Sequence, residues 1–443
     1  MSLSEPTSTR ETPLVVDVPL ARSAVRGLLV RSVGLALGFV SAAVLARTLG
    51  AEGLGAYQGT LALGVIGGGL AAAITERPTT RRLATLDPVV GKPTVAAEIQ
   101  VAHVAAGLAV IAVVLGLLVA SVVPGVPDAW RAALRVAALI TPGAALLSLR
   151  QWIALPLRGV AASIAPEQIA APILFLVLLG AVSTRFLVRA EVVAVLYALA
   201  TMVVWIVAAW RLGVLAAIRR ARRPTRWLPV LVDRVREGRP FVGLTTWGLL
   251  PVYATIPIVA ALGDVADAGR FAVAQQVAGL VGVPLQIVSL AAMPRCARLH
   301  AEGDDVGLAK VVRLACGLSL GLGGLCALVL AIGIEPILAV FGPGFAAAAQ
   351  LVAVLVAGQL VNAALGPNGP TLQMIGREHD ARRIEAATTV VRLVAVAVAA
   401  SAGSAVAVAG VVAATTVARN VALTVTLHHR SGILALPLPW VRT

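Results

Sequence analysis

Long apolar segments recur along the chain from Gly27 to Leu427, separated by short polar or Pro- and Gly-containing breaks. A bilayer core of about 30 Å requires roughly 20 apolar residues in each crossing helix. The pattern therefore predicts an all-α integral membrane protein with about twelve transmembrane helices. The predicted spans are approximately 27–49, 54–75, 95–123, 131–150, 165–184, 190–212, 240–262, 270–293, 313–334, 346–366, 385–402 and 404–427.

The two halves of this pattern resemble each other. The first hairpin contains Gly50 and Gly55, and the hairpin between the seventh and eighth spans contains Gly263 and Gly269. Corresponding features lie about 213–218 residues apart. Because six spans per repeat is an even number, both copies keep the same orientation. We expect two six-helix lobes related by a pseudo-two-fold axis along the membrane normal, as in many transporters.

Composition and charge agree with this organisation. Of the 443 residues, 59% are hydrophobic and only 13% are charged, far from the balance of a soluble domain. The expected parts are a polar N-terminal tail (1–23), an N-lobe (24–212), a basic cytoplasmic linker (213–239), a C-lobe (240–427) and a C-terminal tail (428–443).

The net charge of +15 has an uneven distribution. Basic residues gather in every second inter-helix segment, most densely in the linker between the lobes, as the positive-inside rule predicts. This distribution places both termini in the cytoplasm and the protein in the inner or plasma membrane. It favours contact with membrane lipids and argues against a nucleic-acid partner.

Three arginines lie inside predicted spans: Arg31, Arg392 and Arg419. Ionisable groups at such positions are costly and by default suggest function. The arginines predict a cationic inner cavity, because a guanidinium can pair with two phosphate oxygens and stays charged at any working pH. Two alternatives remain, namely that Arg31 extends to the inner interface and that Arg392 pairs with Glu385.

Uncharged polar side chains add a weaker signal. Gln275 and Gln276 lie in the eighth span, Asn362 lies in the tenth and Asn420 follows Arg419 in the twelfth. They are candidates for contact with a sugar, and hydrogen bonding between helices explains them equally well. Pro284 is expected to bend the eighth span.

Carboxylates are not expected in the middle of any span. Pro166 suits a first helical turn, which would make Glu167 an interfacial residue. A cation-coupled drug antiporter generally needs an intramembrane carboxylate, so its absence would favour an anionic cargo. The sequence also contains no catalytic triad, metal-ligand cluster or phosphate-binding glycine loop, so we expect neither an enzyme nor a cofactor.

Several segments resemble a known family in the correct order. They are GFVSAAVLARTLGAEGLGAYQGTLALGVIGGGLA (38–71), GRFAVAQQVAGLVGVPLQIVSLAAMPRCARLHAEGD (269–304) and the segment 335–383 with its Phe341-Gly342-Pro343 turn. These segments are similar to polysaccharide-transport flippases, a branch of the multidrug/oligosaccharidyl-lipid/polysaccharide exporter superfamily. One departure is that the seventh span, which is often charged in members, has no charge around Tyr253.

The resemblance implies a flippase that turns a polyprenyl-pyrophosphate-linked oligosaccharide from the cytoplasmic to the outer leaflet by alternating access, for cell-surface polysaccharide assembly. It also implies glycan-assembly enzymes as further partners. Two alternatives stay open, namely a multidrug/cation antiporter of the same superfamily and a membrane glycan polymerase or ligase.

Overall fold

The structure, a computed structural model, describes residues 18–86, 92–184, 189–214 and 227–433. Ten helices in these residues are long and apolar enough to cross a membrane, and one further pair of helices forms a broken span. The first helix, α1 (Val18–Thr85), bends back at Gly50, whose φ of 67° lies in the left-handed region open to glycine. It therefore crosses twice, and the predicted twelve spans are confirmed.

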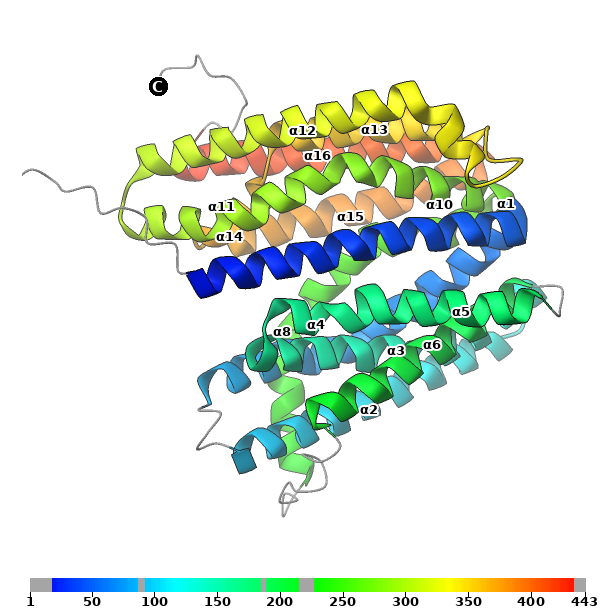
Figure 1. The fold of residues 1–443 in the computed structure, drawn as a ribbon, viewed down its shortest axis with the longest axis horizontal. Helices are drawn as coiled ribbons and strands as arrows, with labels where there is room; N and C mark the ends of the chain where they lie inside the picture. Colours follow the sequence, from blue (N-terminus) through cyan, green and yellow to red (C-terminus); the bar gives the residue numbers. More distant parts are fainter. Residues whose placement is uncertain (1–17, 87–91, 185–188, 215–226, 434–443) are drawn as a thin grey trace, which may run out of the picture.

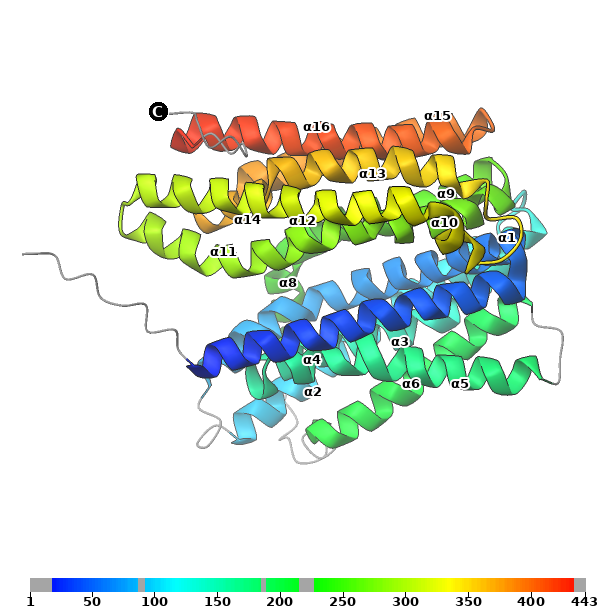
Figure 2. The ribbon, with the colours of Figure 1, turned by 45° about the horizontal axis from the view of Figure 1, so that its top comes forward.

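The helices form two lobes, as predicted (Figures 1 and 2). The N-lobe consists of α1, α2 (Lys92–Val122), α3 (Asp128–Arg158), α4 (Val160–Ala165), a π-helical turn (Pro166–Ala170), α5 (Ala171–Ser183) and α6 (Ala190–Leu212). The C-lobe consists of α8 (Trp227–Tyr253), α9 (Thr255–Leu262), α10 (Val265–Gly279), a 3₁₀ turn (Leu280–Gly282), α11 (Val283–Ala301), α12 (Asp305–Ala339), α13 (Ala348–Leu365), α14 (Asn368–Met374), α15 (Glu378–Ser401) and α16 (Ala405–Ser431).

The lobes meet where their first hairpins cross. A Cβ atom on Gly55 would overlap the carbonyl oxygen of Val265, and one on Gly269 would overlap the carbonyl oxygen of Ala51. The two contacts are equivalent under the repeat, so the crossing is symmetric. Only glycine allows two helix backbones to approach so closely. The lobes converge at this end and diverge at the other (Figure 2).

Arg47 strengthens the same end of the interface. Its Nε donates a hydrogen bond of 2.7 Å to the carbonyl of Val340, and a terminal nitrogen donates one of 3.2 Å to that of Ala339. Both carbonyls belong to the C-terminal end of α12, which carries partial negative charge. Beside this contact, Phe39 packs edge-on against the fully buried Phe341 with ring centroids 5.1 Å apart. A side chain of the N-lobe therefore caps a helix of the C-lobe.

Helix α8 begins inside the segment predicted as the inter-lobe linker (213–239). Residues 215–226 of this segment lie outside the described residues, but α8 already begins at Trp227. The first part of α8 packs on the N-lobe, where Arg234 is 2.6 Å from the carboxylate of Glu98 and both side chains are buried. Glu98 holds this end of α8 because an unpaired buried charge would be costly.

The observed ends of several other elements differ from the predicted ones. Residues 1–17 and 434–443 of the predicted tails lie outside the described residues, whereas α1 begins at Val18 and α16 runs to Ser431. The eighth span is interrupted by the 3₁₀ turn just before Pro284, as predicted. The seventh span is broken between α8 and α9, which meet at an angle of 54°.

The glycine crossing gives a first prediction. Gly55→Val should lower the melting temperature of the purified protein and push the first hairpins apart, because the added side chain has no space. Gly59→Ala, one turn further along the same helix, is the control, since its Cβ would meet other atoms only at 3.8 Å. Equal melting temperatures for the two variants would contradict the close crossing.

Candidate functional site

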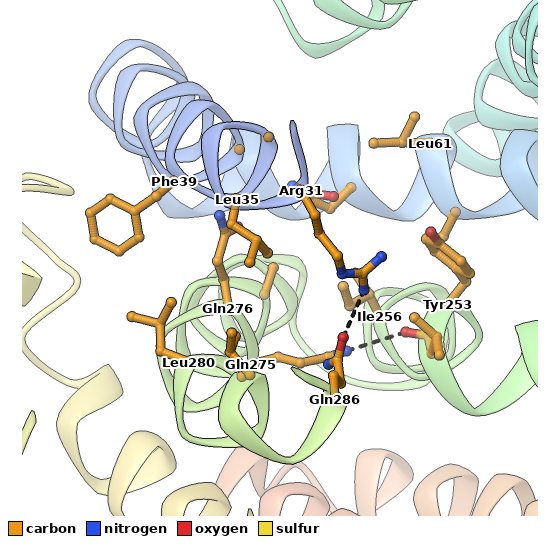
Figure 3. A pocket seen from close by; sticks show the side chains of 18 residues that line it. Arg31, Leu35, Phe39, Leu61, Tyr253, Ile256, Gln275, Gln276, Leu280 and Gln286 are labelled. Atoms are coloured by element: carbon orange, nitrogen blue, oxygen red, sulfur yellow. Dashed lines mark hydrogen bonds between the residues drawn. The ribbon is translucent and has the colours of Figure 1, made fainter. Parts of the chain in front are cut away.

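A cavity of about 460 Å³ lies between the lobes and is bounded by α1, α8, α9, α10 and α11 (Figure 3). Its polar lining consists of Arg31, Gln58, Tyr253, Gln275, Gln276 and Gln286. Three of these residues, Arg31, Gln275 and Gln276, are among the predicted candidates. The cavity is therefore built by both lobes, and its polar groups are one cation and several neutral hydrogen-bonding side chains.

Arg31 reaches across this cavity from α1. It donates a hydrogen bond of 2.7 Å to the side-chain oxygen of Gln286 on α11, and the two side chains point toward each other in Figure 3. Gln275 instead donates to the carbonyl of Val252, near the end of α8, at 3.2 Å. Arg31 is solvent-exposed and has no ion-pair partner among the described residues, so most of its donors are free for a ligand.

A second cavity of about 260 Å³ lies in the C-lobe behind α8. Its lining brings together Arg392 and Glu385 from α15, Arg419 and Thr415 from α16, and Trp247 from α8. Val252 lines both cavities, so α8 is the wall that they share. Two of the predicted arginines thus face one compartment.

The guanidinium of Arg392 uses nearly all of its N–H groups in hydrogen bonds within the protein. It donates to the hydroxyls of Thr415 and Thr416 at 2.9 and 2.5 Å and to the carbonyls of Val412 and Pro251, both at 3.2 Å. Pro251 belongs to the last turn of α8, where carbonyls lack helical partners. Arg392 therefore ties α15 and α16 to the break in the seventh span. The alternative that it pairs with Glu385 is wrong.

Arg419 differs from Arg392 in having unused donors. Its Nε is buried and has no hydrogen-bond partner. Glu385 attracts it electrostatically, but the two groups are not within ion-pair distance in the described residues. A buried donor without a partner is rare and calls for a ligand or water. Arg419 is the member of this cavity best placed to bind an anion.

The remaining candidates make contacts within the protein and line neither cavity. The amide of Asn420 is buried and donates to the carbonyl of Thr416 at 2.8 Å, one helical turn earlier. The amide of Asn362 donates to the side chain of Gln359 on the same helix at 3.1 Å. Both hydrogen bonds lie within one helix, α16 for Asn420 and α13 for Asn362, so they are neither contacts to a cavity nor the bonds between helices that were the alternative.

Two carboxylates lie deeper than the sequence suggested. α1 continues beyond the predicted end of the second span, so Glu76 is buried and accepts a hydrogen bond from Ser148. The helix containing Glu167 begins at Val160, after Gly159 with φ of 79°, which places Glu167 in the π-helical turn two turns inside. Glu167 therefore does not lie in a first helical turn, as expected, but about two turns inside the candidate span Val160–Ser183.

Glu167 lies near polar and charged side chains of both lobes. It lies deep in the protein but remains solvent-exposed, and it interacts electrostatically with Arg31, Tyr197 and Tyr253. Single π-helical turns are frequent at functional sites. Apolar periodicity could not reveal Glu167, since its depth depends on where α4 begins. No group of three or more potential metal ligands occurs among the described residues.

Comparison with known proteins shows which families and structures this architecture resembles. The sequence profile of the MatE family matches residues 253–398, about one third of the chain, and no curated protein matches. An inward-facing multidrug resistance MATE family transporter of the MOP superfamily has a similar structure, with a TM-score of 0.66 and 15% identity over 93% of this chain and 98% of that chain.

Two further solved structures resemble the chain. The outward-facing conformation of a multidrug resistance MATE family transporter gives a TM-score of 0.55 with 16% identity, over 93% of this chain and 96% of that one. A MOP superfamily transporter from Pyrococcus furiosus Vc1, described as having a binding pocket of reverse polarity, gives 0.58 with 15% identity over the same shares. The chain thus has the fold of a multi-pass MATE transporter.

The position of Arg392 gives a second prediction. Arg392→Met should lower the melting temperature strongly, because each buried group left without a partner costs about 1–3 kcal/mol. Arg419→Met should lower it much less, since Arg419 donates no hydrogen bond among the described residues. The measurement is thermal unfolding of both variants in the same lipid or detergent. Equal losses of stability would contradict the different roles assigned to the two arginines.

Proposed function

We propose that the protein is an alternating-access transporter that flips a polyprenyl-pyrophosphate-linked oligosaccharide from the cytoplasmic to the outer leaflet for cell-surface polysaccharide assembly. The MATE fold supports a transporter rather than an enzyme. The two-lobe architecture supports alternating access, because a cavity between lobes can open to either side in turn.

The conformation of the chain fits the first step of such a cycle. The lobes are closed at the Gly55–Gly269 crossing and at Arg47, and diverge at the opposite end. The structure superimposes better on the inward-facing than on the outward-facing MATE transporter. With both termini in the cytoplasm, the open end would face the cytoplasm, where a lipid-linked precursor is made.

The observation that carries the choice of an anionic cargo is Arg419. Arg419 lines a cavity and its buried Nε has no hydrogen-bond partner, and a diphosphate offers several acceptor oxygens to the other N–H groups of a guanidinium. Arg31, in the neighbouring cavity, supplies a second accessible guanidinium. The glutamine amides beside Arg31 can both donate and accept hydrogen bonds, which suits sugar hydroxyls.

This function gives a third prediction. In the native host, deletion of the gene should cause lipid-linked oligosaccharide to accumulate on the cytoplasmic leaflet. Arg419→Gln should restore surface polysaccharide about tenfold less well than the wild-type protein at equal expression, since charge-assisted hydrogen bonds are worth about 1.5–3 kcal/mol. Arg383→Gln, on the exposed start of α15, is the charge-matched control. Normal surface glycans and no accumulation in the deletion strain would contradict the proposal.

A second candidate function is a multidrug/cation antiporter of the same superfamily. Glu167 favours it, because an accessible carboxylate deep within a bundle can bind and release a cation. Glu76 lies close enough to Glu167 to interact electrostatically. This candidate differs from the first in its cargo and rests on a carboxylate of the N-lobe, whereas the first rests on arginines of both lobes.

The antiporter candidate gives a fourth prediction. In proteoliposomes with an imposed proton or sodium gradient, an antiporter would drive uptake or export of a cationic dye, and Glu167→Gln would abolish the dependence on the gradient. The exposed Glu191→Gln is the control. If the wild-type protein moves no cationic dye under any gradient, this second candidate fails.

A further inference from the structure

A further cavity, of about 720 Å³, lies at the closed end of the lobes, where the end of α12 lies beside the bend of α1 (Figures 1 and 2). We call it the closed-end cavity. It shares no lining residue with the cavity of Arg31 or with that of Arg419. Its lining includes Arg47, Gly50, Glu335, Ala339, Gly342 and Gly344.

Two opposite charges from different lobes line the closed-end cavity. Arg47 belongs to α1 in the N-lobe, and Glu335 belongs to α12 in the C-lobe. Both side chains are exposed, and they are not within ion-pair distance of each other. They are the only ionisable groups among the described residues of this lining. The cavity therefore offers one cation and one anion that do not neutralise each other.

Both charged side chains keep hydrogen-bonding capacity. Arg47 uses two N–H groups of its guanidinium on the carbonyls of Ala339 and Val340, and its other N–H groups have no partner among the described residues. Glu335 makes no hydrogen bond or ion pair within the part of the chain that the structure describes. One side of the cavity thus presents free donors and the other presents free acceptor oxygens.

The segment between α12 and α13, which forms one wall of the cavity, is held in place by both lobes. Arg47 binds the carbonyl of Val340 at its start, and Nε of Arg270 on α10 donates to the carbonyl of Gly344 at 3.3 Å. Gly342 has a φ of 104° and packs on the stem of Arg47, which a Cβ atom would approach to 3.4 Å. These contacts give the wall a fixed shape.

The lipid-facing side of α12 leads directly to Glu335. Leu325, Leu328 and Ile332 are exposed and share one face of the helix, because they are three and four residues apart. An exposed apolar face of a membrane helix contacts lipid chains. Glu335 is the next position on this face and lies in the last turns of α12. Its carboxylate therefore lies where the apolar surface ends, at the level of the lipid headgroups.

Arg47 occupies the corresponding place on α1. Val33 and Val40 are exposed on one face of this helix, and neither lines the cavity of Arg31. Arg47 follows Val40 after about two helical turns, just before the bend at Gly50. The closed-end cavity is thus bounded by two lipid-facing helices that carry charges of opposite sign at their ends.

We infer that the closed-end cavity binds the headgroup of a zwitterionic phospholipid with a primary ammonium, of the phosphatidylethanolamine type, from the leaflet at the closed end. The phosphate accepts hydrogen bonds from the free N–H groups of Arg47, and the ammonium donates to the carboxylate of Glu335. The acyl chains lie on the apolar faces of α1 and α12. A trimethylammonium group has no N–H to donate, and a glycerol headgroup has no cation.

The bound lipid joins the two lobes, since its phosphate contacts the N-lobe and its ammonium contacts the C-lobe. Opening of this end would separate Arg47 from Glu335 and break one of the two contacts. A ligand that binds one conformation better shifts the population toward it. The lipid therefore stabilises the conformation in which this end is closed, whatever cargo the protein carries.

Lipid binding to the full-length protein, purified in detergent and freed of native lipid, tests the site. The probes are dioleoyl phosphatidylethanolamine, phosphatidylcholine and phosphatidylglycerol, and native mass spectrometry gives the affinity of each. Phosphatidylethanolamine should bind about tenfold more tightly than phosphatidylcholine, because only its ammonium donates to Glu335. Glu335→Gln should remove this preference and leave phosphatidylcholine binding unchanged. Arg47→Gln should weaken the binding of both lipids, since both have the phosphate.

Glu52→Gln is the matched control, because Glu52 is an exposed carboxylate at the same end that does not line the cavity. Equal affinities of the Glu335→Gln and Glu52→Gln variants for phosphatidylethanolamine would overturn the site. So would a wild-type protein that binds phosphatidylcholine or phosphatidylglycerol as tightly as phosphatidylethanolamine. If soluble glycerophosphoethanolamine binds as tightly as the lipid, the site takes a soluble zwitterion and the assignment to a lipid is wrong.

The joining of the lobes has its own readout. Spin labels at the exposed Asp128 and Ala347, in a variant whose three native cysteines are replaced, report the distance between the lobes at the closed end. In nanodiscs, phosphatidylethanolamine should reduce the population with a long distance relative to phosphatidylcholine, and Glu335→Gln should abolish this difference. Identical distance distributions of the parent variant in the two lipids would contradict the stabilisation of the closed end.

Discussion

The close backbone contact between Gly55 and Gly269 determines where the two lobes join and hence where they can separate. At each glycine, a backbone carbonyl oxygen of the other hairpin occupies the space where a side chain would be: that of Val265 at Gly55 and that of Ala51 at Gly269. The two contacts are equivalent under the internal repeat and lie side by side, so the two helices are closest at this one crossing. Away from the crossing the helices diverge. The cavity containing Arg31 lies along the diverging helices.

The cost of charge in a low-dielectric environment explains how the arginines differ. Arg234 and Arg82 are paired with carboxylates and hold α8 on the N-lobe. Arg392 is satisfied by hydroxyls and carbonyls and holds the break in the seventh span. Arg419 retains an unused donor, and this difference, rather than its charge alone, makes it a candidate for binding a ligand.

Much of the fold could be predicted from the sequence. The length of the apolar segments indicated twelve spans, and the spacing of the hairpin glycines indicated two similar lobes. The interruption of regular α-helix just before Pro284 was also predictable, since proline interrupts helical hydrogen bonding. The glycines at 55 and 269 marked the repeat, but their contact with each other depends on how the lobes pack.

The site was less predictable because side-chain depth depends on helix ends and on tertiary contacts. Glu76 was placed just beyond the second span and Glu167 in the first turn of the fifth, since hydropathy falls before α1 ends and Gly159 does not show that α4 begins beside it. The partners of Arg392 come from α8 and α16, far away in the sequence.

The central claim is most directly tested by reconstituting the purified protein in liposomes that contain a fluorescent polyprenyl-diphosphate-linked sugar. A membrane-impermeant reductant then destroys only the fluorophores exposed in the outer leaflet of the liposome. The account predicts that the wild-type protein carries labelled lipid from the inner to the outer leaflet, so that fluorophores first protected from the reductant are also destroyed. The Arg419→Gln variant should lose this protected fluorescence more slowly. If the wild-type protein leaves the protected fraction unchanged, the protein is not a flippase for this class of lipid.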